Sequence, residues 1–125
     1  MQHALEYYEQ GLEICQELNY SFGKIEALNG LGLIWQQVDE VSKSLMYYAQ
    51  ALTIARNTGY QHHEAKTLEH IGKGHEILGE YEKAVRCYLQ ALTLYEANSH
   101  PRLTQVRKLI EKLRAQNSLH YQDDG

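Results

Sequence analysis

Three segments of the chain repeat one another at intervals of 40 residues: ALEYYEQGLEI (residues 4–14), SLMYYAQALTI (44–54) and AVRCYLQALTL (84–94). Tyrosine, glutamine and leucine recur at matching places in all three copies. A repeat of roughly 20 to 50 residues is typical of a solenoid, because each unit buries its apolar face by stacking on the next. The repeat therefore predicts a modular fold of a kind that binds other proteins and rarely catalyses.

Apolar residues in and between these segments have the spacing of α-helices. In the first segment Leu5, Tyr8, Leu12 and Cys15 fall on one helical face. The single proline of the chain also favours helices over a loop-rich β fold. The pattern predicts six helices with short links, so that neighbours run antiparallel. We thus predict an all-α fold: an antiparallel helix-pair solenoid, or α-α superhelix, with a C-terminal capping helix.

The predicted organisation is one repeat domain over residues 1–117 and a flexible tail over residues 118–125. The domain comprises the second helix of an incomplete repeat (3–20), two repeats (21–58 and 61–97) and a capping helix (101–116). Gly59 and Gly79 are expected to end helices, since glycine tolerates the left-handed conformation found there. The last helix has one apolar stripe and a basic outer face, as a solenoid cap should.

Composition limits the classes of function. No apolar run is long enough to span a membrane, and no signal-peptide pattern precedes the first helix. Cys15 and Cys87 occupy non-equivalent places in the repeat and form no CxxC motif, so we expect reduced thiols in a cytoplasmic protein. A net charge of −4 argues against nonspecific binding of nucleic acid.

The charge is uneven along the chain. Residues 1–41 hold seven acids and one base, whereas residues 101–114 hold five bases and one acid. These may be described either as solvated helix faces or as complementary ends that attract another chain or an acidic partner. Both interpretations stay open at the level of the sequence.

Small and large residues alternate in a way that resembles the tetratricopeptide repeat, whose first helix reads Trp/Leu-x2-Leu-Gly-x2-Tyr and whose second reads Ala-x3-Phe/Tyr-x2-Ala. The segment LGEYEKA (78–84) is very similar to the turn between the two helices of that family. The 40-residue spacing is similar to its long-repeat subtype. The matching small residues are Gly32, Ser44, Ala51, Gly72, Ala84 and Ala91, and the large ones are Leu28, Leu31, Trp35, Tyr48, Leu68, Ile71, His75 and Tyr88.

The resemblance covers about residues 3–97 and implies a concave groove, lined by the first helix of each repeat, that binds a peptide or helix of a partner protein. The long-repeat subtype often carries asparagines where this chain has Gly30, Leu33, His70 and Lys73, so the location of the groove is carried over but its asparagines are not. The groove-facing candidates are Glu26, Asn29, Leu33, Gln36, Gln37, Lys66, Glu69, His70, Lys73 and Glu76.

Three of these candidates are basic or can become so. Lys66, His70 and Lys73 share one helical face and could hold a carboxylate or an acidic peptide. A solvated polar face is the alternative interpretation of the same residues.

The chain starts at what should be the second helix of a repeat. The face formed by Leu5, Tyr8, Leu12 and Cys15 is therefore expected to lack part of its cover and to seek a partner. Self-association as a homodimer, docking onto another protein, and loss of an upstream repeat from a longer protein would each account for this.

Motifs for catalysis, cofactors and metals are absent from the sequence. There is no nucleophile elbow, phosphate loop or dinucleotide fingerprint, and His62, His63, Glu64 and His70 lack zinc-ligand spacing. The sequence thus predicts a non-catalytic adaptor without cofactor or metal, which binds a protein and neither nucleic acid nor membrane. The alternative is an oligomerisation element or a fragment of a larger multi-repeat regulatory protein.

Overall fold

The computed structural model describes the backbone of residues 2–124 and the side chains of residues 2–117. Within these limits the chain forms six helices and no strand, which confirms the predicted all-α class. The helices are α1 (Gln2–Glu17), α2 (Ser21–Gln37), α3 (Val41–Thr58), α4 (Gln61–Ile77), α5 (Tyr81–Ala97) and α6 (Leu103–Asp124). None of the described helices is long and apolar enough to cross a membrane.

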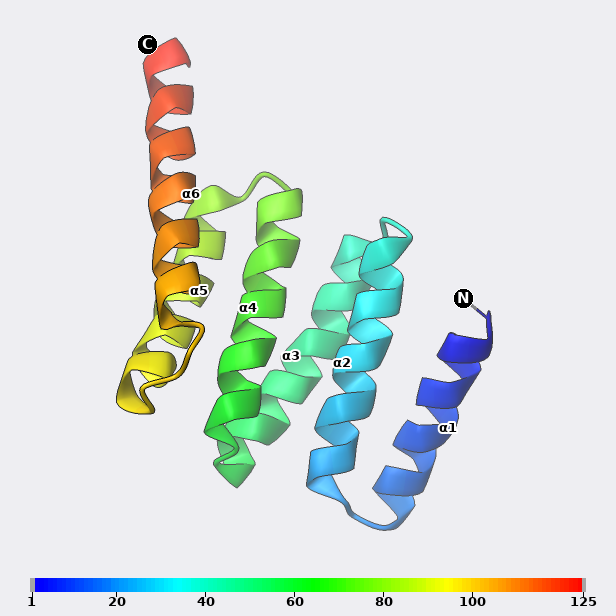
Figure 1. Ribbon diagram of the computed structural model, residues 1–125. Coiled ribbons are helices and arrows are strands. Elements are labelled where there is room, and N and C mark those ends of the chain that lie inside the picture. The colour runs from blue at the N-terminus through cyan, green and yellow to red at the C-terminus, as the bar shows by residue number, and fades with distance from the viewer. Residues whose placement is uncertain (1, 125) are drawn as a thin grey trace.

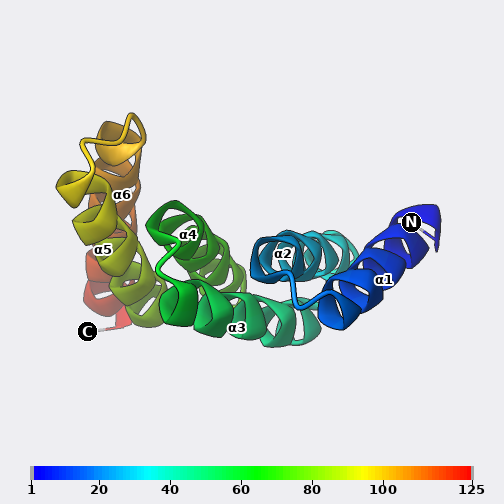
Figure 2. The ribbon, with the colours of Figure 1, turned by 90° about the horizontal axis from the view of Figure 1, so that it is seen from below.

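The helices form an antiparallel row in which each contacts its neighbours along the chain, and α2 also meets α4. The two termini lie at opposite ends of this row (Figure 1). Figure 2 shows that the row is curved, with α2 and α4 on its inner side and α3 and α5 on its outer side. This is the predicted helix-pair solenoid.

The ends of the helices follow from the local sequence. Gly59 and Gly79 have φ angles of 76° and 77°, a left-handed conformation that glycine adopts without steric cost. α6 extends beyond the predicted capping segment, to Asp124. The predicted flexibility of residues 118–125 falls on side chains outside the described residues, so it stays a prediction.

Tyrosines of the second helices pack onto glycines of the first helices. A Cβ atom placed on Gly32 would lie 2.3 Å from Cε1 of Tyr48, and one on Gly72 would lie 2.7 Å from Cε1 of Tyr88. The absent side chains therefore make the space that the rings fill. Each phenol oxygen donates to the same place in its repeat, to Gln36 at 3.1 Å and to Glu76 at 3.2 Å. The sequence period is thus also the period of the core contacts.

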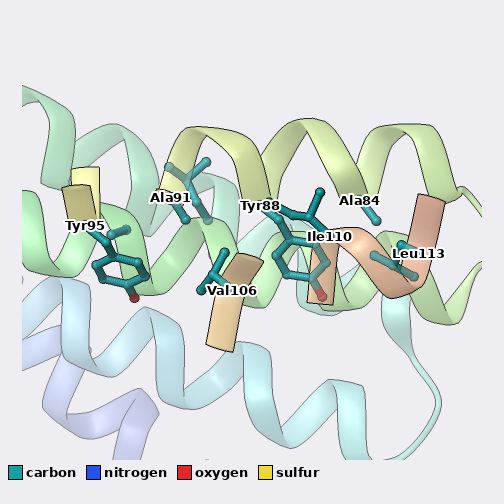
Figure 3. Close-up of a cluster of buried hydrophobic side chains, with 9 residues drawn as sticks. Ala84, Tyr88, Ala91, Tyr95, Val106, Ile110 and Leu113 are labelled. Carbon is teal, nitrogen blue, oxygen red and sulfur yellow. The ribbon is translucent and has the colours of Figure 1, made fainter. Parts of the chain in front are cut away.

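The neighbouring repeat covers the other side of each tyrosine. The ring of Tyr48 is stacked on His70 at a centroid distance of 5.2 Å. Tyr88 belongs to a buried cluster with Val106 and Ile110 of α6, and Figure 3 shows side chains of α5 and α6 alternating along this contact. Since burial hinders formation of the phenolate, the pKa values of Tyr48 and Tyr88 lie well above the ordinary value.

The same position in α1 gives a matched comparison. Tyr48 is fully buried, whereas Tyr8 is covered by α2 alone and is half-buried. We expect Tyr48→Ala to lower the free energy of unfolding by about 3–5 kcal/mol, because it leaves a large cavity. Tyr8→Ala should cost clearly less. Urea denaturation followed by circular dichroism measures both values, and equal losses would contradict this account of the core.

Candidate functional site

A cavity of about 550 Å³ lies between α4 and α6, with α5 beneath it. We call it the α4–α6 cavity. Its lining combines basic, aromatic and aliphatic side chains: His62, Lys66, Glu69, His70, Lys73, Tyr88, Tyr95, Arg102 and Leu109. Four of these, Lys66, Glu69, His70 and Lys73, are among the residues predicted for the groove, and the structure brings them together in one place.

Glu69 is held by residues from two other elements. Its carboxylate accepts hydrogen bonds from Arg102, with Nε at 3.0 and 3.1 Å and Nη2 at 2.6 Å from its oxygens. The hydroxyl of Tyr95 donates to the same carboxylate. This hydrogen bonding raises the pKa of Arg102, and burial together with Glu69 raises that of Tyr95. The negative charge of Glu69 is therefore neutralised inside the protein.

The two lysines of the cavity are turned to solvent. Lys66 is exposed, and Lys73 lies 3.5 Å from Glu76, which also accepts the hydroxyl of Tyr88. Between them His70 is stacked on Tyr48, and its buried Nε2 has no hydrogen-bond partner. Burial, with Lys66 next in importance, lowers the pKa of His70 below its ordinary value, so that the ring is neutral at pH 7.

One end of the cavity is formed by stacked rings. His62 stacks on His100 at 5.1 Å, and His100 stacks on Tyr95 at 4.5 Å. The backbone N–H of Arg102 donates to Nδ1 of His100 at 3.1 Å, which requires a neutral ring at that nitrogen. Burial, and then the neighbouring His100, lower the pKa of His62. The side chains near the cavity therefore carry few protons at neutral pH apart from those of the lysines and Arg102.

The groove residues predicted on α2 lie in different surroundings. Asn29 is a correction: it is buried between α2 and α4, where its amide and the hydroxyl of Thr67 exchange hydrogen bonds of 2.9 and 3.2 Å. Gln36 accepts the hydroxyl of Tyr48, and Glu26 lies 2.9 Å from Nε2 of His63. The remaining two, Leu33 and Gln37, are exposed on α2.

The structure adds cavity residues that the sequence analysis did not name. His62 and Arg102 stand 40 residues apart and so occupy the same place in successive first helices. The repeat period could have found this pair. Tyr95 and Leu109 carry no such signal, since they reach the cavity through the packing of α5 against α6.

A second hollow, of about 570 Å³, lies between α1 and α2. We call it the α1–α2 cleft. It is lined by Tyr7, Tyr8, Gln10, Gly11, Ile14, Cys15, Gly23, Glu26 and Ala27. No residue of α1 is buried, whereas Ser44, Tyr48, Ala51 and Ala55, at the matching places of α3, are fully buried. Among the described residues, no helix covers this side of α1.

The residues predicted for self-association turn mainly toward α2. Leu12 packs against the buried cluster of Ile25 and Leu28, Tyr8 lies over Gly30, and Cys15 approaches Gly23. Leu5 is half-buried on the same side of the helix. The strongly exposed apolar residues at this end of the chain are instead Tyr7, Ile14 and Leu18.

The histidines of the α4–α6 cavity give the stability a pH dependence. Because the folded-state pKa values of His62 and His70 are lowered, the unfolded chain takes up protons that the folded chain refuses once the pH falls below about 6.5. We expect the urea midpoint to be level above this pH and to fall from pH 6.5 to pH 5.5. In the double variant His62→Gln/His70→Gln the fall should be smaller. An unchanged slope would show that other groups cause it.

Comparisons with known proteins bear on the fold and the family. The sequence of residues 24–97, more than half of the chain, matches the family model of the tetratricopeptide repeat. No curated protein matches the chain in sequence. The family model does not distinguish the long-repeat subtype, which stays a prediction.

Among solved structures, the crystal structure of the apo form of RapI is similar to this chain, with a TM-score of 0.85 and 22% sequence identity. The match covers 91% of this chain and 42% of RapI, so the chain spans less than half the length of that protein. At this identity the likeness shows a shared fold. Together with the repeat period, the stacked helix pairs and the matching family model, it leads to one conclusion: the chain belongs to the tetratricopeptide repeat family.

Proposed function

We propose that this chain is a non-catalytic adaptor, which binds an acidic peptide or the acidic end of a helix from a partner protein in its concave groove. The observation that carries the proposal is the charge arrangement of the α4–α6 cavity. Glu69 is neutralised by Arg102, which leaves Lys66 and Lys73 to attract a ligand carboxylate. Tyr88, Tyr95 and Leu109 supply apolar surface for neighbouring side chains of the peptide.

The class of partner follows from the family and from the charge of the chain. Tetratricopeptide repeats are protein-interaction modules, and a net charge of −4 favours a protein over nucleic acid as the ligand. We place the chain in the cytoplasm, with reduced thiols, and the free Cys15 and Cys87 support this location.

The groove is tested with a fluorescein-labelled peptide in which leucine alternates with glutamate and aspartate. We expect fluorescence anisotropy to show binding that weakens between 50 and 500 mM salt, because solvent-exposed lysines contribute to it. Lys66→Glu/Lys73→Glu should reduce the affinity at least tenfold. The control Lys108→Glu/Lys112→Glu makes the same charge change on exposed residues of α6 outside the cavity and should bind as the parent does. Equal losses in both variants would contradict a specific groove.

A second candidate function is self-association through the N-terminal end, which would make the chain an assembly element. The uncovered side of α1 favours it, since exposed apolar stripes of this kind are interaction surfaces. Because the chain spans less than half of RapI, a role as one part of a larger multi-repeat regulatory protein is the alternative.

Molar mass distinguishes these cases. We expect light scattering after size exclusion to show a mass that rises from monomer to dimer as the protein concentration increases. The groove variant Lys66→Glu/Lys73→Glu should behave in the same way, since its substitutions lie away from α1. A monomer at every concentration would contradict self-association and leave groove binding unaffected.

A further inference from the structure

The exposed side of α1 carries the spacing of a coiled-coil seam. Ala4, Tyr7, Gly11, Ile14 and Leu18 follow one another at intervals of three and four residues, the a and d positions of a heptad. Tyr7, Ile14 and Leu18 are 72%, 55% and 71% exposed. The backbone N–H of Leu18 donates to the carbonyl of Ile14, so helical geometry continues to the end of the seam. We call these five residues the α1 seam.

The complete repeats show what covers the matching positions elsewhere. Ser44 and Ala51, equivalent to Ala4 and Gly11, are fully buried, and Tyr47 and Ile54, equivalent to Tyr7 and Ile14, pack against the buried cluster of α2. The α1 seam is thus shaped to receive a helix at the place that α2 has beside α3. The α1–α2 cleft is the space in which such a helix would lie.

A helix in this place needs a small residue opposite Tyr8. Gly32 and Gly72 have that role opposite Tyr48 and Tyr88, where a Cβ would come within 3 Å of the ring. In α6 the residue at this register is Lys112. A lysine there would overlap the tyrosine ring, so α6 of a second copy does not fit the cleft in the register of the repeats. End-to-end stacking of copies is therefore disfavoured despite the opposite charges of the two ends.

α1 itself has the spacing that the cleft requires. Leu28, Gly32 and Trp35 of α2 place a large residue four positions before a glycine and another three positions after it. Tyr7, Gly11 and Ile14 repeat this arrangement. No atom lies within 4 Å of a Cβ built on Gly11, so a second helix has room to approach its backbone.

We propose that two copies of this chain pair through their α1 helices, antiparallel and centred on Gly11, with each α1 entering the α1–α2 cleft of the other copy. This inference rests on the second candidate function and names the surface and the register for it. In this arrangement Tyr7 lies against Ile14 of the other copy, and Ala4 lies against Leu18. Large side chains then meet smaller ones at every step, as in well-packed helix pairs.

The charges of α1 are compatible with this pairing. Glu6, Glu9 and Glu13 lie on the side of the helix opposite Gly11, at 100° per residue, so the like charges of the two copies are kept apart. The antiparallel register brings Glu17 close to His3 of the other copy, a favourable pair when the histidine is protonated. The acidic stripe then faces solvent in the dimer.

The surface is tested by sedimentation equilibrium of the full chain with one matched pair of variants. Ile14→Glu places a charge in the seam and should weaken the dimer at least 100-fold. Met46→Glu makes a comparable change at a 65% exposed position of α3, outside the seam, and should leave the dimer unchanged. Both should keep the helical content of the parent. A dimer that tolerates Ile14→Glu would overturn the proposed surface.

The register is tested with single cysteines in a Cys15→Ala/Cys87→Ala background. Gly11→Cys lies at the centre of the pairing, so mild oxidation should link two copies within the Cα separation of about 4.4–6.8 Å that a disulfide allows. Glu9→Cys lies on the opposite side of α1 and should remain reduced. Cross-linking of Glu9→Cys in preference to Gly11→Cys would overturn the register. Neither result affects the peptide test, which depends on Lys66 and Lys73.

Discussion

The structure depends on the contact between a tyrosine ring and a glycine of the preceding helix, repeated every 40 residues. Tyr48 lies on Gly32 and Tyr88 on Gly72, with the phenol oxygens bound to Gln36 and Glu76 at equivalent places. Because each ring is also covered by the next repeat, by His70 or by the Val106–Ile110 surface, one residue joins three helices. The distance between repeats and the curvature of the row both follow from how these rings fit.

Polar pairs between successive first helices complete this arrangement. Asn29 and Thr67 satisfy each other in a buried position between α2 and α4, and Glu69 is bound by Arg102, just before α6. A buried amide without such a partner would be costly, so these pairs fix how one repeat is placed on the next. They also decide which side chains remain available to a ligand, since Glu69 is used within the protein while Lys66 is not.

Helices and their order could be predicted from the sequence, because the repeat period, the glycines at helix ends and the helical spacing agree with one another. The limits were at the contacts between elements. Asn29 was assigned to the groove because its helical face was known, whereas its burial depends on Thr67 in another repeat. For α1, spacing alone could not tell the stripe that meets α2, with Leu12, from the neighbouring stripe with Ile14 that stays exposed. The cavity likewise required Arg102, 33 residues from its partner Glu69.

The row of helices, in which contacts join mainly neighbours along the chain, also determines how the protein folds. Contacts that are close in sequence form with little loss of loop entropy, so such chains fold rapidly and can nucleate at more than one place. The pairs α2–α3 and α4–α5 each carry a buried tyrosine and are the natural nuclei. α1 has no buried residue, so it adds to a structure already formed and exchanges its amide hydrogens first.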